Sequence, residues 1–315
     1  MDPLSTGDPL RLGPYRLLGV LGAGGMGKVY LGRGGQGQPA ALKVLRPELA
    51  HDQQMVRRFL REAQAAQAVT GKGVARVLGA QTEGGRQWIA TEFLAGPTLD
   101  QAVQQYGPLP ESAVRVLAGE LAATLGDVHA AGLVHRDIKP SNIVLTSGGP
   151  RVIDFGIARP EHGLTLTSTG QAPATPGYGA PEQVLGQRTG PAGDVFALGA
   201  VLAYAASGRS AFTGGHVAAV QYEVVHGEPD LSAVPGALRQ PIAYCLAKDP
   251  AARPSPVWLA RALTPPRRPA LPWKNGPLAA EITQREEHAR RLAEMPGAEA
   301  AGVPRRRLLG AFAAG

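Results

Sequence analysis

A short loop near the middle of the chain groups side chains that can handle a proton, a phosphoryl group and a metal ion. The loop is His135-Arg136-Asp137-Ile138-Lys139-Pro140-Ser141-Asn142. Within it Asp137 can accept a hydroxyl proton, Lys139 can neutralise a phosphoryl group in transfer, and Asn142 offers an oxygen ligand to a hard metal ion. Asp154 follows an apolar pair of residues, so the end of a buried strand would present a second metal ligand. The order and spacing of these groups point to phosphoryl-transfer chemistry.

A glycine-rich stretch lies near the N-terminus and spans Gly22-Ala23-Gly24-Gly25-Met26-Gly27-Lys28-Val29. Such spacing lets the backbone approach a phosphate chain without Cβ clashes. Strand-like residues follow it, which favours a flap between two strands over a dinucleotide-binding turn that leads into a helix. Lys43 lies inside another apolar strand, where a buried ammonium needs a partner, and Glu62 on the following predicted helix is the candidate. The alternatives are an ordinary glycine-rich hairpin and a lysine at a sheet edge that faces solvent.

Two lobes must position these residues. The apolar alternation predicts strands over 15–21, 28–31, 40–45, 74–80 and 86–94, with a helix over 52–69. A hairpin turn is expected at Gly34-Gly35-Gln36-Gly37. Helices follow from about residue 98, and the longest runs from Glu111 to about Ala130, between Pro110 and Gly132. The pattern therefore predicts a small β-rich lobe with one main helix, followed by a larger helical lobe.

Composition excludes several classes of protein. Of the 315 residues 44% are apolar and 18% charged, which is typical of a globular chain. Cys245 is the only cysteine, so neither an intramolecular disulfide framework nor a zinc site of several thiolates is expected. The net charge is +7, but nine of the Lys and Arg residues and five of the Asp and Glu residues follow Thr264. The body is thus nearly neutral and poor in aromatics, which argues against nucleic-acid binding.

These segments together resemble the protein kinase family, in its bacterial, eukaryotic-like (Hanks-type) serine/threonine branch, over about residues 12–264. The resemblance rests on the glycine-rich stretch, Ala-Leu-Lys at Lys43, the helix Glu62, the loop 135–142, Asp154-Phe155-Gly156, Ala180-Pro181-Glu182, Asp194-Val-Phe-Ala-Leu-Gly and Arg253. It implies an α+β fold with an N-lobe over 12–94 and a C-lobe over 98–264. It also implies transfer of the ATP γ-phosphate to Ser/Thr hydroxyls of protein substrates, with Mg²⁺ as the metal and Mn²⁺ as an alternative. Lys139, two residues after Asp137, matches the Ser/Thr class rather than the Tyr class.

The resemblance also implies a role for each site residue. Asp137, Lys139, Lys43 and Glu62 would be catalytic, and Asn142 and Asp154 would hold the metal. Thr91 would be the gatekeeper of the interlobe hinge 91–94, and Glu92 and Leu94 would offer backbone groups to adenine. The full implied nucleotide set is Leu21, Gly22, Ala23, Gly24, Gly25, Met26, Gly27, Lys28, Val29, Ala41, Lys43, Thr91, Glu92, Leu94 and Val144.

Residues 154–182 would form the activation segment. Its middle is rich in hydroxyls, and we expect Thr167 and Thr169 to be autophosphorylated and Arg136 to pair with a phosphorylated residue. A solvated Ser/Thr loop is the alternative. Thr175 is expected to help recognise the acceptor hydroxyl. Glu182 and Arg253 are expected to form a buried structural ion pair.

Both ends of the chain lie outside the implied kinase domain. Residues 1–11 are interpreted as an N-terminal extension without a signal peptide, and 265–304 as a Pro-rich, juxtamembrane-like linker. Residues 305–315 pair a basic cluster with a short apolar stretch, and we favour the start of a truncated membrane span. The alternative is a soluble protein with an unstructured C-terminus. The kinase domain is expected to be cytoplasmic, and a homodimer is a candidate arrangement for autophosphorylation.

Two functions from other classes compete with an active protein kinase. A pseudokinase scaffold would bind nucleotide or partners without turnover, yet every reacting residue type is present. A small-molecule phosphotransferase of related fold would lack Ala180-Pro181-Glu182 and the Asp194 helix, both of which are found here.

Overall fold

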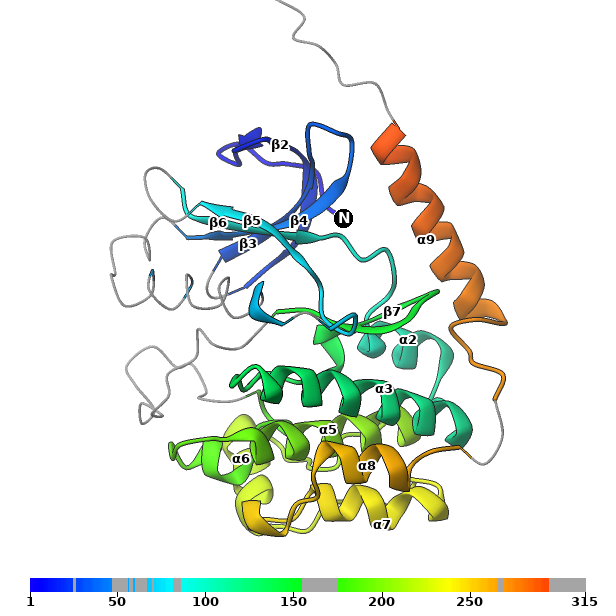
Figure 1. The fold of residues 1–315 in the computed structure, drawn as a ribbon. Coiled ribbons are helices and arrows are strands. Elements are labelled where there is room, and N and C mark those ends of the chain that lie inside the picture. The colour runs from blue at the N-terminus through cyan, green and yellow to red at the C-terminus, as the bar shows by residue number, and fades with distance from the viewer. Residues whose placement is uncertain are drawn as a thin grey trace, which may run out of the picture.

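The computed structural model describes residues 1–24, 27–46, 56, 59, 67–69, 71–81, 86–154, 175–265 and 269–294. They form two lobes, one built on a sheet and one helical, as expected, and the described chain passes between them over 93–98 (Figure 1). The expected helix over 52–69 lies largely outside the described residues.

The small lobe is an antiparallel sheet of order β1-β2-β3-β4-β6-β5. Its strands are β1 (Arg11–Leu12), β2 (Tyr15–Ala23), β3 (Gly27–Arg33), β4 (Pro39–Leu45), β5 (Val77–Gln81) and β6 (Trp88–Glu92). Alternate residues of β2 are buried, including Tyr15 and Leu17, because successive side chains of a strand point to opposite faces. Gly37, with φ of 88°, closes the expected turn between β3 and β4 by donating its N–H to Gly34. The expected strands of this lobe are confirmed with small shifts of their ends.

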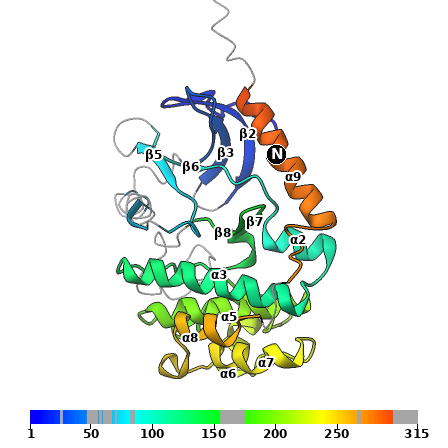
Figure 2. The same ribbon diagram turned by 45° about the vertical axis from the view of Figure 1, so that its right-hand side comes forward.

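The large lobe packs helices around one continuous core. It contains α2 (Leu99–Tyr106), α3 (Glu111–Ala130), α4 (Pro181–Val184), α5 (Pro191–Ser207), α6 (Val217–His226), α7 (Gly236–Cys245) and α8 (Pro256–Ala262), with short 3₁₀ turns at Pro140–Asn142 and Pro250–Ala252. A hairpin of β7 (Ile143–Thr146) and β8 (Gly149–Val152) lies between α3 and the small lobe (Figure 2). The predicted helix 111–130 is confirmed, and Gly132 just beyond it has φ of 74°.

The buried ion pair that joins two parts of this lobe is confirmed. Arg253 donates Nη1 and Nη2 to the two carboxylate oxygens of Glu182, at 2.7 and 2.8 Å. The pair fixes α4 to the segment before α8, on the side of the large lobe that carries the end of the activation segment.

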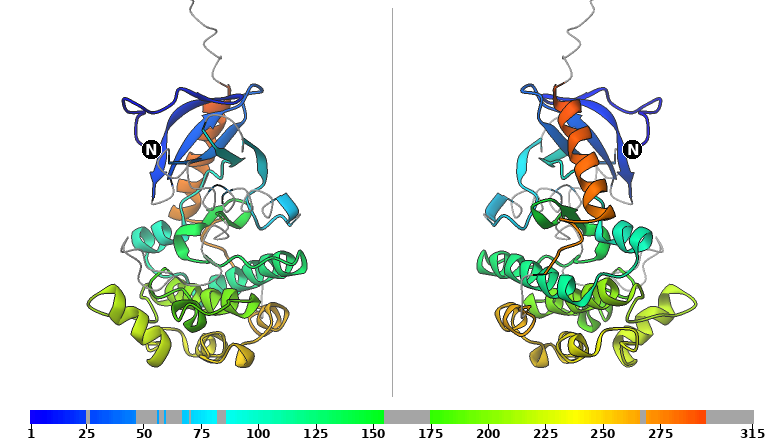
Figure 3. Two further views of the ribbon diagram at one scale, coloured as in Figure 1. Left: turned by 90° about the vertical axis from the view of Figure 1, so that its left-hand side faces the viewer. Right: turned by 90° about the vertical axis from the view of Figure 1, so that its right-hand side faces the viewer.

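The interpretation of 265–304 as a linker is wrong for its central part, since Pro277–Glu294 form helix α9. This stretch has a proline only at its first residue, where a helix tolerates one. Leu278, Ile282 and Ala289 recur on one face and are buried, which supplies the packing that an isolated helix lacks. The helix runs upward from the large lobe along one side of the sheet (Figure 3).

The N-terminal residues are also part of the fold. Asp2 and Val20 exchange backbone hydrogen bonds of 2.9 and 2.8 Å, so the chain start pairs with β2. Asp8 accepts hydrogen bonds from Lys28 Nζ at 2.8 Å and Tyr30 Oη at 2.7 Å. Residues 1–11 therefore pack onto the sheet rather than extend from it. Over all described residues, none of the helices has the length and apolar character that a membrane span requires.

Candidate active site

The loop that carries Asp137 runs between α3 and β7, and a buried carboxylate from α5 fixes its shape. Arg136 has φ of 65°, a left-handed conformation that is unfavourable for a residue with a Cβ. Asp194 accepts the N–H of His135 and the N–H of Arg136, each at 2.8 Å, and also lies 2.8 Å from Nε2 of His129. Because Asp194 is only 1% exposed, these contacts are shielded from water and can hold the strained residue.

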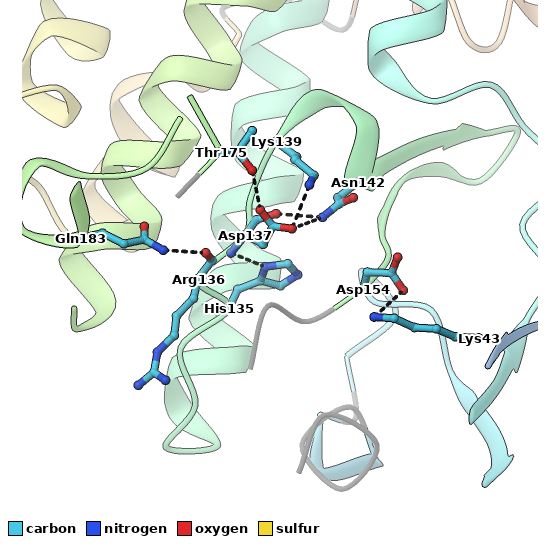
Figure 4. A network of polar contacts seen from close by, with 9 residues as sticks. All are labelled: Lys43, His135, Arg136, Asp137, Lys139, Asn142, Asp154, Thr175 and Gln183. Atoms are coloured by element: carbon cyan, nitrogen blue, oxygen red, sulfur yellow. Dashed lines mark hydrogen bonds and ion pairs between the residues drawn. The ribbon is translucent and has the colours of Figure 1, made fainter. Parts of the chain in front are cut away.

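Asp137 is the centre of a polar cluster (Figure 4). Its Oδ1 accepts a hydrogen bond from Thr175 Oγ1 at 3.0 Å. Its Oδ2 lies 3.0 Å from Lys139 Nζ and 3.1 Å from Asn142 Nδ2. A hydroxyl, a cation and an amide thus surround one carboxylate, and Thr175 shows that a hydroxyl can donate a hydrogen bond to it.

Lys43 and Asp154 come from different lobes and approach each other across the gap between them. Their Nζ and Oδ1 atoms are 4.0 Å apart. Lys43 is on β4, paired with Val29 of β3 and Ile89 of β6, so it lies within the sheet rather than at its edge. The alternative of an edge-strand lysine is therefore wrong.

The two candidate metal ligands are held next to each other by the backbone. Ile153 donates its N–H to the carbonyl of Asn142 at 2.9 Å, which places the following Asp154 beside the loop. Nδ2 of Asn142 contacts both the carbonyl and the carboxylate of Asp137, so Oδ1 is the amide atom suited to ligation. Asp154 has φ of 54°, a second strained position at this site.

This oxygen donor set fits a hard divalent cation. Magnesium is commonly held by one or two carboxylates together with phosphate oxygens and water. Among the described residues no point gathers three or more His, Cys, Asp or Glu side chains. A cation at Asn142 and Asp154 would therefore depend on further oxygens from a bound phosphate group.

A cavity of about 620 Å³ opens between the lobes and reaches Lys43 and Asp154. That volume is in the range of small-molecule sites. Nine of the expected nucleotide residues line it: Leu21, Gly22, Val29, Ala41, Lys43, Thr91, Glu92, Leu94 and Val144. The structure thus brings the hinge, the sheet and the large-lobe hairpin to one cavity.

Four other expected nucleotide residues are described but do not line this cavity: Ala23, Gly24, Gly27 and Lys28. The Lys28 ammonium is engaged by Asp8, and this contact holds the pKa of the Asp8 carboxyl well below its usual range. A Cβ on Gly27 would lie 1.8 Å from the Val44 carbonyl oxygen, so this glycine is needed for strand packing. Gly22 and Gly24 have open space instead, which suits a flap that a ligand approaches.

The hinge residues Thr91 and Glu92 line the cavity and also make contacts that pack the sheet and join the lobes. Thr91 pairs with Ala41 across the sheet, and its Oγ1 lies 3.5 Å from the Ala41 carbonyl. The Glu92 carboxylate pairs with Arg151 of β8 and accepts the Arg76 N–H at 2.9 Å. Its side chain therefore ties the lobes together.

Arg136 extends its side chain away from Asp137 (Figure 4), while Gln183 donates to its carbonyl at 3.1 Å. Burial lowers the pKa of His135, which keeps its ring neutral behind the loop. The expected residues Gly25, Met26, Glu62, Thr167 and Thr169 lie outside the described residues.

Two features of the site were not expected from the sequence. Asp194 anchors the loop by accepting the backbone N–H groups of Arg136 and His135, which precede it by 58 and 59 residues in the sequence. The α9 residues that line the cavity were assigned to a linker, although the spacing of Leu278 and Ile282 before Ala289 could have revealed a helix.

The site combines a cavity between two lobes, a half-buried lysine from the sheet and an Asp137 loop with Arg136 in a left-handed conformation. Asn142 and Asp154 lie beside that loop, and this combination is typical of a protein kinase. The comparisons agree, because the model of the protein kinase domain matches residues 15–264. The probable serine/threonine-protein kinase PkwA of Thermomonospora curvata is 45% identical over 264 residues, which cover 84% of this chain and 36% of that protein. The serine/threonine-protein kinase AfsK of Streptomyces coelicolor is 44% identical, with coverage of 84% and 33%.

Among solved structures, the PknI kinase domain of Mycobacterium tuberculosis superposes with a TM-score of 0.64 at 28% identity. That match covers 82% of this chain and 98% of the solved domain. The chain belongs to the protein kinase family, among the bacterial Hanks-type serine/threonine kinases. It spans about a third of the length of the curated relatives it matches. Members of this family use ATP and a divalent metal and act on proteins.

Proposed function

We propose that this protein is an active serine/threonine kinase that transfers the γ-phosphoryl group of ATP to protein hydroxyls. The observation that carries the proposal is the Asp137 carboxylate, which has a threonine hydroxyl at 3.0 Å on one oxygen and Lys139 at 3.0 Å from the other. An acceptor Ser or Thr hydroxyl that reached the same carboxylate would meet a proton acceptor and a cation together.

The reaction follows from these positions. As the acceptor oxygen bonds to the γ-phosphorus, the bond from that phosphorus to the β,γ-bridging oxygen breaks and ADP leaves. Asp137 takes the hydroxyl proton, and Lys139 offsets charge on the transferring group. Lys43 holds the α and β phosphates, and Thr175 orients the acceptor beside Asp137. Asn142 and Asp154 would hold Mg²⁺, which would neutralise phosphate charge when bound.

The first test measures transfer to protein. The full chain is incubated with γ-labelled ATP, Mg²⁺ and a generic protein substrate, beside Asp137→Asn and the control Asp127→Asn, an exposed carboxylate on α3. We expect label on Ser and Thr with the wild type and the control, and almost none with Asp137→Asn. A pseudokinase would give no label in any sample, and a small-molecule phosphotransferase would give none on protein. Repeating the assay with Mn²⁺ ranks the two metals.

We further propose autophosphorylation at Thr167 and Thr169, with the negative charge paired to Arg136. Phosphopeptide mapping of active protein against Asp137→Ala protein tests this. Both threonines should carry phosphate only in the active sample, and unmodified threonines in fully active enzyme would contradict the proposal. Chemical cross-linking during the reaction tests whether a homodimer carries it out.

Membrane attachment through residues 305–315 is a separate proposal, supported by the basic cluster before an apolar stretch. Fractionation of the full-length gene product should place it with membranes. Recovery in the soluble fraction alone would contradict attachment.

A further inference from the structure

Helix α9 is rooted in the large lobe. Leu278 and Ile282 are buried within the core of that lobe. Glu281 accepts a hydrogen bond from Tyr106 of α2 at 2.8 Å, and Glu286 accepts the N–H of Ser147 in the β7–β8 turn at 3.1 Å. These contacts fix the first half of the helix, as far as Glu286, to the large lobe.

The same helix also contacts the segment 93–98 that connects the lobes, and the small lobe. Arg285 donates to the carbonyl of Gly96 at 3.3 Å. Arg33, at the end of β3, donates to the carbonyl of Ala293 in the last turn of α9 at 2.8 Å. The last carbonyls of a helix lack hydrogen-bond partners within the helix and carry partial negative charge, so a guanidinium is a favourable partner there. We call this contact between Arg33 and Ala293 the clasp. Helix α9 therefore bridges both lobes beside the hinge (Figures 1 and 3).

One face of α9 lines the interlobe cavity. The lining residues are Gln284, Arg285, His288, Arg291 and Leu292. Their spacing places them on one side of the helix. Two of these residues are arginines, and Arg285 is ion-paired with Glu281 of the same helix. Arg291 is therefore the arginine that we take to present positive charge to a site that would bind an anionic nucleotide. Because the cavity still measures about 620 Å³, the helix borders it without filling it.

We propose that α9 is an integral wall of the nucleotide site and strengthens nucleotide binding. It does so in two ways: Arg291 attracts the anionic ligand, and the Arg33–Ala293 clasp resists opening of the lobes. Hinge opening is the usual route by which such clefts exchange ligands. This inference rests on the proposed function, since it assumes that the cavity takes ATP and ADP.

The test is calorimetric binding of Mg·ADP and of adenosine to the full chain. Arg291→Ala removes the cation on the wall, and its matched control is Arg290→Ala, an exposed neighbour that does not line the cavity. Arg33→Ala opens the clasp, and its matched control is Arg16→Ala, the exposed residue opposite it on β2. All four variants keep the buried residues that anchor α9, so the lobes retain their core.

The two variants should behave differently toward the two ligands. Arg291→Ala should weaken ADP binding by about threefold to fivefold and adenosine binding much less, because only ADP is charged. Arg33→Ala should weaken both ligands by a similar, roughly threefold factor. Both controls should match the wild type. If the two variants also match the wild type, or if Arg33→Ala binds more tightly because α9 obstructs the cavity, the inference is overturned. If the wild type binds no ADP, the proposed function fails instead.

Discussion

Replacing Arg253 by alanine should destabilise the protein more than any surface change. Its guanidinium donates to both carboxylate oxygens of Glu182 at 2.7 and 2.8 Å, and Glu182 is only 7% exposed. It also donates to the carbonyls of Ala247, Ala192 and Lys248. The substitution leaves a buried carboxylate without its partner, which costs about 3–5 kcal/mol.

That loss is large enough to see by thermal unfolding. A domain of this size loses about 2–4 °C in melting temperature per kcal/mol, so a fall of roughly 6–20 °C is expected. A double-mutant cycle with Glu182→Gln isolates the pair, and its coupling free energy should be about 2–3 kcal/mol. The matched control is Arg115→Ala, which breaks the more exposed Glu111–Arg115 pair on α3 and should cost less than about 1 kcal/mol. A coupling energy no larger than the control's loss would refute the argument that burial makes this pair important.

Three further predictions concern single groups. Asp137→Asn should lower kcat by about 10²- to 10⁴-fold and leave the affinity for Mg·ADP nearly unchanged. Initial rates and calorimetry measure the two effects, and a loss of affinity as large as the loss of kcat would contradict a role confined to the reaction. Burial lowers the pKa of His135 below its ordinary value of 6.5. Below about pH 6.5 the unfolded chain therefore binds a proton at this histidine more readily than the folded chain does, and the free energy of unfolding should fall as the pH drops. Urea unfolding from about pH 7.5 to about pH 5.5 checks this, and His135→Gln should show a shallower fall. Burial raises the pKa of Cys245 to about 12, so a thiol reagent should label it only after denaturation, and rapid labelling of folded protein at neutral pH would contradict its burial.

Much of the fold could be predicted because local signals and packing agree. The helix Glu111–Ala130 ends where Pro110 and Gly132 indicate, and alternating apolar residues mark β2 and β4. Loop 135–142 and Asp154 were expected at one site, and the backbone bond from Ile153 to Asn142 joins them. These features depend on short-range chemistry that the sequence displays directly.

Contacts distant in sequence were harder to foresee. The density of prolines after residue 264 suggested a linker, but α9 fits between two of them and gains its stability from packing. Lys28 was expected at the nucleotide because it belongs to the glycine-rich stretch, but its ammonium group forms an ion pair with Asp8. In both cases a contact crosses the boundary of the expected kinase domain, since α9 packs on the core of the large lobe and Asp8 pairs with a residue of the sheet.

The candidate site residues come from both lobes, so the separation of the lobes affects the site. Asp137, Asn142 and Asp154 all belong to the large lobe, and two residues in left-handed conformations, Arg136 and Asp154, shape this half of the site. Asp194 holds the first of these from the buried core, so the shape of the Asp137 loop depends on the packing of the large lobe. Lys43 arrives from the small lobe, and its 4.0 Å separation from Asp154 depends on how far the lobes close. Helix α9 contacts Arg33 of the small lobe and Ser147 of the large lobe, so it is well placed to limit changes in that separation.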